Sequence, residues 1–88
     1  MALAFPNSSR SYDATRRAVR FWGHDTAMEW SFFVTEDALK KVHPAMAEQD
    51  EASMLGAFDA HRERIWAAAG RAYSRGRKGS YELGAADL

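Results

Sequence analysis

Histidine and aspartate stand side by side at positions 24 and 25, and they are the residues of this sequence best suited to proton transfer. A histidine can act as a general base when a carboxylate orients its imidazole ring. Neighbouring residues of a tight turn rarely provide that geometry. Gly23-His24-Asp25 is equally typical of a turn, because an aspartate side chain can bond to its own backbone. We therefore interpret the pair as structural first and as catalytic only second.

Three histidines, His24, His43 and His61, could bind a metal together with nearby acids. Their spacing lacks the His-x-x-x-His pattern, which places two imidazoles on one face of a helix. The chain contains no cysteine, which excludes disulfides, thiolate nucleophiles and cysteine-based metal sites. No glycine-rich loop precedes a helix, and no serine stands in a nucleophile elbow. We therefore expect no cofactor, no metal and no catalytic residue, and an enzyme would need a pocket that converges on His24, His61 or Tyr81.

A β-hairpin over residues 17–34 is the strongest local signal in the sequence. Its two arms are rich in β-branched and aromatic residues, and the polar residues 23–26 separate them as a turn with a glycine at its head. A turn centred there pairs Arg20 with Glu29 as a cross-strand ion pair. Side-chain alternation then places six apolar residues on one face of the hairpin: Val19, Phe21, Met28, Trp30, Phe32 and Val34.

Two shorter segments complete the predicted sheet. Residues 2–5 are expected to form a strand that a proline stops, whereas residues 10–17 are expected to form a loop or an irregular edge. A last strand over residues 79–83 would point Tyr81 and Leu83 inward. The order in which the strands pair stays open at this point.

Two helices are predicted between the hairpin and the last strand. The first is capped by Thr35 and ends before Pro44, with acidic residues in its first turn and basic residues near its end, as the helix dipole favours. The second follows Asp50 and runs over about 51–75, with an apolar stripe that packs on the hairpin. The sequence therefore predicts one domain over residues 1–88 of the α+β class, in the order β-β-β-α-α-β, with both helices on one face of a small antiparallel sheet.

The other face of the predicted hairpin carries Arg20, Trp22 and Phe33. An exposed tryptophan and phenylalanine next to an arginine are typical of a stacking or protein-contact surface. Three interpretations stay open. The N-terminal segment covers the rings through Phe5 or Tyr12, a second copy of the chain covers them, or a foreign ligand does.

Basic side chains are concentrated at the two ends of the chain and acidic ones in its middle, although the net charge is zero. If the two ends meet in space, they form a basic patch. Zero net charge gives no long-range attraction to nucleic acid, so neutralisation across the fold is the simpler interpretation. The residues of the possible basic patch are Arg16, Arg17, Arg64, Arg71 and Arg75.

Length and composition describe a small globular protein. The 88 residues are 47% hydrophobic and 12% aromatic, unlike those of a disordered chain. The first residues lack a basic n-region, so we expect no signal peptide. No apolar stretch approaches the roughly 18 residues of a membrane-spanning helix. The absence of cysteine favours a reducing compartment, and we expect a cytoplasmic protein.

Four strings stand out along the chain: Ser-Arg-Ser-Tyr-Asp at 9–13, Ala-Val-Arg-Phe-Trp-Gly-His-Asp at 18–25, Ser-Phe-Phe-Val-Thr-Glu-Asp-Ala-Leu at 31–39 and Phe-Asp-Ala-His-Arg-Glu-Arg-Ile at 58–65. Together they resemble the DUF1488 family, the domain of unknown function 1488, whose members are small stand-alone proteobacterial proteins. The resemblance covers nearly the whole chain. It implies a compact α+β fold and a bacterial cytoplasmic setting, and it implies no activity, cofactor or catalytic residue.

The sequence as a whole favours a non-enzymatic accessory or protein-interaction domain, because an aromatic face is present and a catalytic constellation is missing. Its interaction surface would be Arg20, Trp22 and Phe33. Its partner would be a second copy of the chain or an unidentified larger protein, and we expect no membrane partner. Weak nucleic-acid binding through the basic patch is the first alternative. A small enzyme or ligand-binding protein, with a site near the two histidines and Tyr81 named above, is the second.

Overall fold

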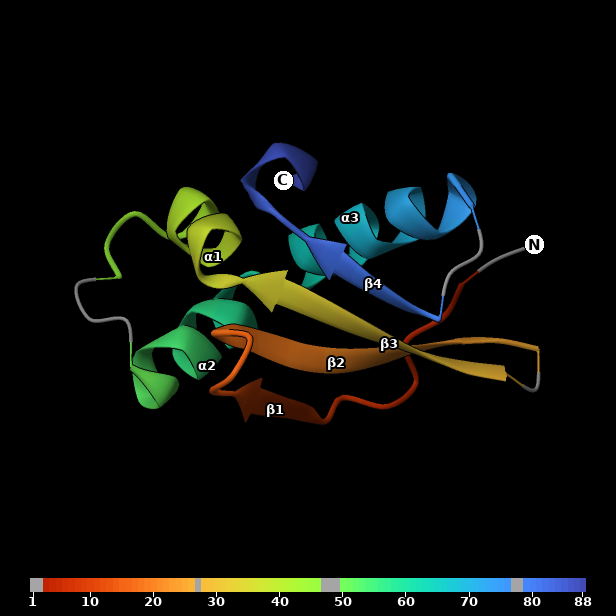
Figure 1. Cartoon of the computed structure of the whole chain (residues 1–88), viewed down its shortest axis with the longest axis horizontal. Coiled ribbons are helices and arrows are strands. Elements are labelled where there is room, and N and C mark those ends of the chain that lie inside the picture. The colour runs from red at the N-terminus through yellow and green to blue at the C-terminus, as the bar shows by residue number, and fades with distance from the viewer. Residues whose placement is uncertain (1–2, 27, 47–49, 77–78) are drawn as a thin grey trace.

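Four strands and three helices make up the part of the chain that this computed structural model describes, residues 3–26, 28–46, 50–76 and 79–88 (Figure 1). The strands are β1 (Arg10–Asp13), β2 (Ala18–Asp25), β3 (Met28–Thr35) and β4 (Ser80–Leu83). The helices are α1 (Glu36–Val42), α2 (Glu51–Ala60) and α3 (Arg62–Ser74), followed near the C-terminus by the short 3-10 helix η1 (Ala85–Asp87). None of the helices in the described ranges is long and apolar enough to cross a membrane.

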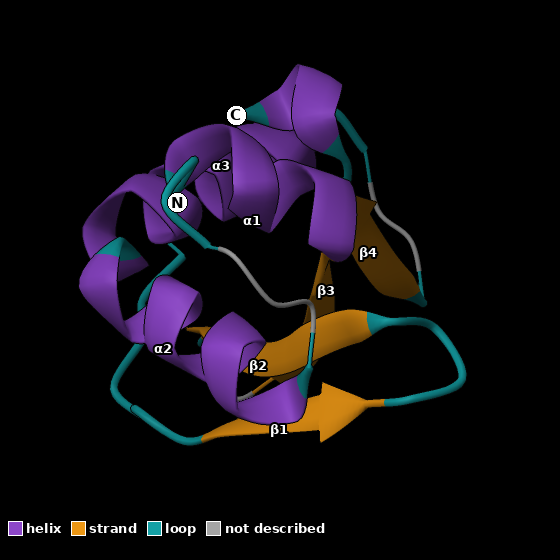
Figure 2. Ribbon diagram, turned by 90° about the vertical axis from the view of Figure 1, so that its left-hand side faces the viewer, coloured by secondary structure: helices purple, strands orange, loops and turns teal. Residues whose placement is uncertain are grey.

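The strands form one sheet in the order β1-β2-β3-β4, and the helices cover one of its faces (Figure 2). The predicted α+β class is thereby confirmed. The first three strands are antiparallel, but β4 runs parallel to β3, so the sheet is mixed. The reason is the connection, because three helices between β3 and β4 form a crossover that returns the chain to the same end of the sheet.

The hairpin has the predicted faces but a different register. Arg20 faces Phe33, and Glu29 faces His24, so the predicted pair of Arg20 with Glu29 is wrong. The strands continue past the predicted turn and reverse at Thr26, whose φ of 59° lies in the left-handed region that tight hairpin turns require. The observed cross-strand partner of Arg20 is residue 33, four positions after the predicted partner, residue 29. Because that shift is even, the alternation of side chains between the two faces is preserved.

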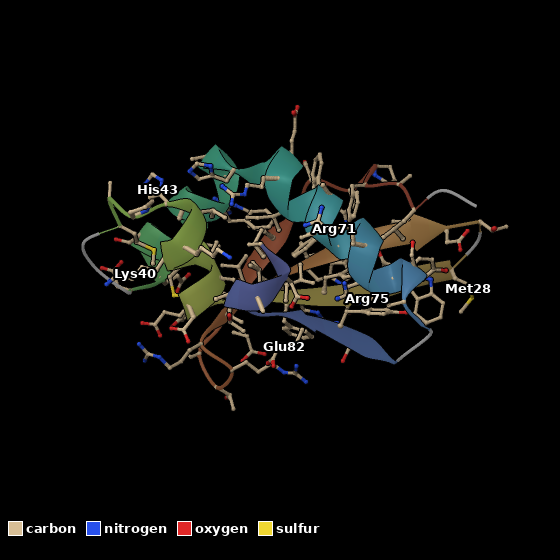
Figure 3. The ribbon with its side chains drawn as sticks, turned by 90° about the horizontal axis from the view of Figure 1, so that it is seen from above. Met28, Lys40, His43, Arg71, Arg75 and Glu82 are labelled. Atoms are coloured by element: carbon tan, nitrogen blue, oxygen red, sulfur yellow. The ribbon has the colours of Figure 1, made fainter. Side chains whose placement is uncertain are left out.

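Gly23 lies inside β2 instead of at the head of a turn. A Cβ atom at this position would come within 3.0 Å of ring carbons of Phe32 and Phe5 and within 3.1 Å of Leu3. The glycine therefore lets other side chains approach the strand closely. Met28, which was expected in the core, lies at the tip of the longer hairpin and is 56% exposed (Figure 3).

The first strand forms at an edge of the sheet, in the segment that was expected to be a loop or an irregular edge. Residues 10–13 pair with β2, whereas Ala4 forms only an isolated bridge with His24. Residue 2 of the strand expected at 2–5 lies outside the described residues. Two contacts hold β1 in place: Tyr12 faces β2 on the helix side of the sheet, and the Arg10 guanidinium pairs with Asp59 of α2 at 2.8 Å. The sequence offered no apolar alternation strong enough to reveal this edge strand.

The helix caps are confirmed, and the long helix is not continuous. Thr35 Oγ1 accepts a hydrogen bond from the Ala38 N–H at 3.3 Å, and Asp50 Oδ1 accepts one from the Ser53 N–H at 2.9 Å. The helix expected over about 51–75 is broken at His61, whose φ of −128° and ψ of 30° are not helical. The break lets α2 contact β1 and β2 while α3 contacts β4, so that the two helices follow the twist of the sheet.

The core lies between the sheet and the three helices. Aromatic rings form its centre, where Phe32 stacks with Phe21 at a centroid distance of 5.5 Å and with Tyr81 at 4.9 Å. Tyr81 and Leu83 point into this core, as predicted. The largest fully buried side chains are Phe21, Phe32, Phe58, Leu39, Met54, Ile65, Leu83, Val19 and Val34.

Candidate functional site

The face of the sheet turned away from the helices is called the outer face here. Residues that pair directly across neighbouring strands share a face, so the pairing identifies its members. At its centre are Arg20 and Trp22 of β2, Ser31 and Phe33 of β3, and Ser80 and Glu82 of β4. Arg16, from the turn before β2, reaches over the same face.

Two arginines lie against two aromatic rings on the outer face. The Arg20 guanidinium carbon is 5.2 Å from the centroid of the Trp22 ring and 5.7 Å from that of Phe33. Its Nη2 donates a hydrogen bond to Ser31 Oγ at 2.9 Å, which fixes the direction of the side chain. The Arg16 guanidinium carbon lies 4.0 Å from the Phe33 centroid. All three distances are within the roughly 6 Å of a cation–π contact. The structure therefore brings Arg20, Trp22 and Phe33 together, as the sequence predicted.

Of the three interpretations of what covers the two rings, the structure contradicts the first, cover through Phe5 or Tyr12, and leaves the other two open. Phe33 is only 6% exposed and lies under Arg16, whereas Trp22 is half-buried. The described part of the N-terminal segment packs elsewhere. Phe5 instead stacks on Trp66 of α3 at 5.1 Å, on the helix side. Tyr12 also lies on that side, because it faces the buried Val19.

Two members of the outer face were missed by the sequence analysis. Ser80 and Glu82 lie beside Ser31 and Phe33 in the parallel pair of β3 and β4. The alternation in residues 79–83 contained the signal, because a strand that points Tyr81 and Leu83 inward must point its even-numbered residues outward. What the sequence could not show is that β4 joins the sheet next to β3.

The adjacent His24 and Asp25 point to opposite faces and do not form a catalytic pair. His24 Nε2 lies 3.0 Å from Glu29 Oε2 on the outer side of the hairpin tip. Asp25 is buried at 6% exposure and accepts hydrogen bonds from the Tyr73 hydroxyl of α3 and, at 3.2 Å, from Thr26 Oγ1. Alternation contained a signal for this burial as well, because Asp25 shares its parity with the core residues of β2.

Two of the histidines meet, although they are far apart in the sequence. His43 Nδ1 and His61 Nε2 lie 3.0 Å apart, where the end of α1 meets the break between α2 and α3. Both rings are half-buried. Over the ranges that the structure describes, no group of three or more His, Cys, Asp or Glu residues could hold a metal ion. The pair is therefore a link between α1 and the helix break.

The residues of the enzyme hypothesis lie on separate parts of the fold. His24 is on the outer side of β2, His61 is at the helix break, and Tyr81 is buried in β4 with its hydroxyl donating to the Gly76 carbonyl at 3.1 Å. A hollow of about 650 Å³ along residues 59–66 includes His61 but neither of the others. A groove of about 560 Å³ between Phe5 and α3 includes none of the three. The structure thus gives the hypothesis no shared pocket among these residues.

The five arginines of the possible basic patch fall into two groups. Arg16 and Arg17 precede β2, and Arg17 pairs with Glu36 at 2.8 Å. Of the other three, Arg64 and Arg71 belong to α3 and Arg75 follows its last residue, on the helix side of the sheet. Figure 3 shows Arg71 and Arg75 there. Arg71 donates to the Asp87 carbonyl at 3.0 Å and Arg75 pairs with the Asp87 carboxylate at 2.9 Å. The two groups therefore do not form one patch, and an acidic side chain pairs with one member of each group, Arg17 in the first and Arg75 in the second.

Asp59 is the centre of the strongest charge cluster on the helix side. Its carboxylate accepts two hydrogen bonds from Arg10, at 3.0 and 2.8 Å, and one from Arg62 at 2.8 Å. These hydrogen bonds lower the pKa of Asp59 below its ordinary value of 3.8, the bond from Arg10 contributing most and burial opposing it. Arg62 also lies over the rings of Phe58 and Trp66, at 4.9 and 5.8 Å.

Replacing Asp59 with asparagine should lower the free energy of unfolding at pH 7 by about 1 kcal/mol, because the cluster is partly exposed and screened by water. Folding depresses the pKa of this carboxyl, so its contribution is complete above about pH 4 and is lost as the pH falls through the folded-state pKa. The difference between the wild type and Asp59→Asn in urea unfolding should therefore narrow below pH 4. Glu63→Gln, at an exposed position on α3, is the control and should show no such narrowing.

Comparisons with known proteins support the fold and name no activity. The sequence profile of DUF1488, described as a protein of unknown function, matches residues 3–83. The crystal structure of a protein of unknown function from the DUF1488 family of Shewanella loihica PV-4 is similar in fold, with a TM-score of 0.79 over 92% of this chain and 90% of that chain. The two sequences are 15% identical, so the likeness concerns the fold alone. A comparison with curated proteins gives no match.

Proposed function

The chain belongs to the DUF1488 family, and from that premise we propose that it is a protein-docking domain whose partner binds on the outer face of the sheet. One observation carries the proposal: two guanidinium groups lie against Phe33 and Trp22 on the side of the sheet opposite the helix layer. Tryptophan and arginine are enriched among the residues that dominate the binding energy of protein interfaces.

The fold holds these side chains ready for binding. Trp22 and Phe33 belong to the two central strands, each of which is paired on both sides. The hydrogen bond from Arg20 to Ser31 fixes the arginine next to both rings. A surface that is already ordered loses less side-chain entropy when a partner binds. The same rigidity suits a platform for docking better than it suits a site that must close around a substrate.

Charge supports a protein partner over a nucleic acid. Arg16 and Arg20 share the outer face with Glu29 and Glu82, so phosphates would meet carboxylates as well as guanidinium groups. Phe33 lies under Arg16, and a base could stack on it only after displacing that side chain. Weak nucleic-acid binding stays a second proposal. It requires an affinity for single-stranded DNA that falls steeply with salt, and a lack of binding at low salt would remove it.

The proposal needs neither a cofactor nor a catalytic residue. We infer that the docking takes place in the bacterial cytoplasm, which the cysteine-free sequence favours. Docking, as distinct from catalysis, is also supported by the separation of His24, His61 and Tyr81, because general acid–base groups must share a site with their substrate.

A photo-crosslinking residue should locate the docking face in living cells. A benzoylphenylalanine introduced at Glu82, which is exposed on the outer face, is expected to form discrete crosslinked products. The same residue at Glu63, which is exposed on α3, should form at least tenfold less product, because α3 lies on the other side of the sheet. Product masses on a denaturing gel and by mass spectrometry give the measurement.

Trp22→Ala provides the second arm of this experiment. Removing the Trp22 ring from the outer face should reduce the amount of crosslinked product at position 82 at least fivefold, because tryptophans at protein interfaces often dominate affinity. Met28→Ala is the matched control, since Met28 is a more exposed apolar side chain at the hairpin tip. Equal products from positions 82 and 63, or products insensitive to Trp22→Ala in a protein that still folds, would contradict the proposal.

A further inference from the structure

Resting on the proposed docking function, we propose that the partner on the outer face is a second copy of this chain. The two copies stack sheet on sheet, related by a two-fold axis that runs parallel to β3 between them. Three observations lead to this arrangement: the order of charges across the strands, the order of side-chain sizes, and the lack of an ion pair at Glu82.

Charge changes sign across the outer face in a single row. Arg20 of β2 faces Phe33 of β3, and Phe33 lies beside Glu82 of β4. The row therefore reads positive, aromatic, negative, with the aromatic ring in its middle. The two charges stand two strand spacings apart, about 10 Å, and lie on opposite sides of β3.

Side-chain size changes across the neighbouring row in the same sense. Trp22 of β2 faces Ser31, which lies beside Ser80 of β4. The row therefore reads large, small, small. A large ring on one side of β3 and short side chains on the other give the face a raised side and a lower side. A surface of this kind can fit a copy of itself if the two sides are exchanged.

A two-fold axis parallel to β3 makes that exchange in both rows at once. It places Arg20 over the partner's Glu82 and Trp22 over the partner's Ser80, and the reciprocal contacts follow from the symmetry. An axis across the strands would instead place Arg20 over the partner's Arg20. Stacked sheets lie about 10 Å apart, a distance that arginine and glutamate side chains span together. Charge and shape therefore select the same axis.

Glu82 is the residue that most needs such a partner. It is exposed, and no ion pair joins it to any residue within the described ranges. In Figure 3, Glu82 lies on the side of β4 opposite Arg71 and Arg75 of α3. Arg16, above Phe33, lies near the proposed axis, so it would approach its own symmetry copy. The partner's Glu82 stands one strand spacing away and offsets that repulsion, which makes Glu82 central to the interface.

Charge reversal tests the arrangement by sedimentation equilibrium of the purified full chain. The wild type is expected to dimerise, and Glu82→Arg should raise the dimer dissociation constant at least tenfold, because like charges would then meet. Arg20→Glu should weaken the dimer in the same way. The double variant, Arg20→Glu with Glu82→Arg, restores opposite charges across the axis and should return the dissociation constant close to the wild-type value, well below that of either single variant. Glu63→Arg, on the other side of the sheet, is the control and should leave it unchanged.

The sedimentation and crosslinking results together distinguish failure of the proposed dimer from failure of the proposed docking function. Rescue by the double variant supports the two-fold stacking. A chain that stays monomeric at millimolar concentration overturns the self-pairing, as does a double variant weaker than both single ones. In that case, products at position 82 that contain another protein and depend on Trp22 would still support docking. Circular dichroism of each variant confirms that the comparison is made between folded proteins.

Discussion

Replacing Phe32 with alanine is expected to lower the free energy of unfolding by about 3–5 kcal/mol. Phe32 is fully buried, and its ring stacks with Phe21 and Tyr81 and lies 6.2 Å from the ring of Phe5. Removing it would leave a cavity between β2, β4 and the N-terminal segment, because Gly23 has no side chain to fill the space. Globular domains are stable by about 5–15 kcal/mol in total. The substitution should therefore remove a large fraction of the stability.

Urea unfolding followed by far-ultraviolet circular dichroism measures this loss. Phe32→Leu is the graded control, because leucine keeps much of the apolar volume and should cost less than alanine. A loss below about 1 kcal/mol for Phe32→Ala, far under the usual range for such truncations, would mean that the aromatic stack does not hold the sheet in solution. The outer-face residues would then lack the rigid support on which the docking proposal depends.

The hydrogen bond between Tyr73 and the buried Asp25 carries the second large prediction. Tyr73→Phe should lower the free energy of unfolding by about 1.5–3 kcal/mol, the range for hydrogen bonds to charged groups. The hydroxyl of Tyr73 donates to Asp25 Oδ2, and the Thr26 hydroxyl donates to Asp25 Oδ1. Without the tyrosine hydroxyl, the buried carboxylate loses much of what compensates its removal from water. The contact also fastens the hairpin to α3.

A double-mutant cycle isolates this contact from other effects. Asp25→Asn and Tyr73→Phe, alone and together, should show a coupling energy of about 1 kcal/mol or more in urea unfolding, because the two groups touch. Tyr12→Phe is the matched control, since Tyr12 is a half-buried tyrosine in the edge strand β1. Additive effects of the two substitutions would show that the side chains do not interact in the folded protein.

Local patterns predicted the elements and faces that depend on neighbouring residues. Thr35 and Asp50 were identified as caps because a short polar side chain ahead of an apolar repeat satisfies the free N–H groups of a helix start. Alternation placed Phe21, Phe32 and Tyr81 toward the core and Trp22 away from it. These features need no knowledge of the rest of the chain, and the structure confirms each of them.

Alternation has a period of two and therefore cannot decide between registers that differ by an even number. That is why Arg20 pairs with Phe33 in place of Glu29, although its face is correct. The helix break at His61 has a similar cause. Residues 60–62 contain neither proline nor glycine, and the break follows from the twisted sheet that α2 and α3 must both contact.

The sequence alone therefore determined the class of the fold, the helix caps, the direction of most side chains and the grouping of Arg20, Trp22 and Phe33. The tertiary structure alone decided that β4 lies parallel to β3 and brings Glu82 onto the outer face, and that Asp25 meets Tyr73. The physical reason is the range of the interactions. Capping and alternation act within a few residues, whereas contacts between elements depend on how distant parts of the chain pack together.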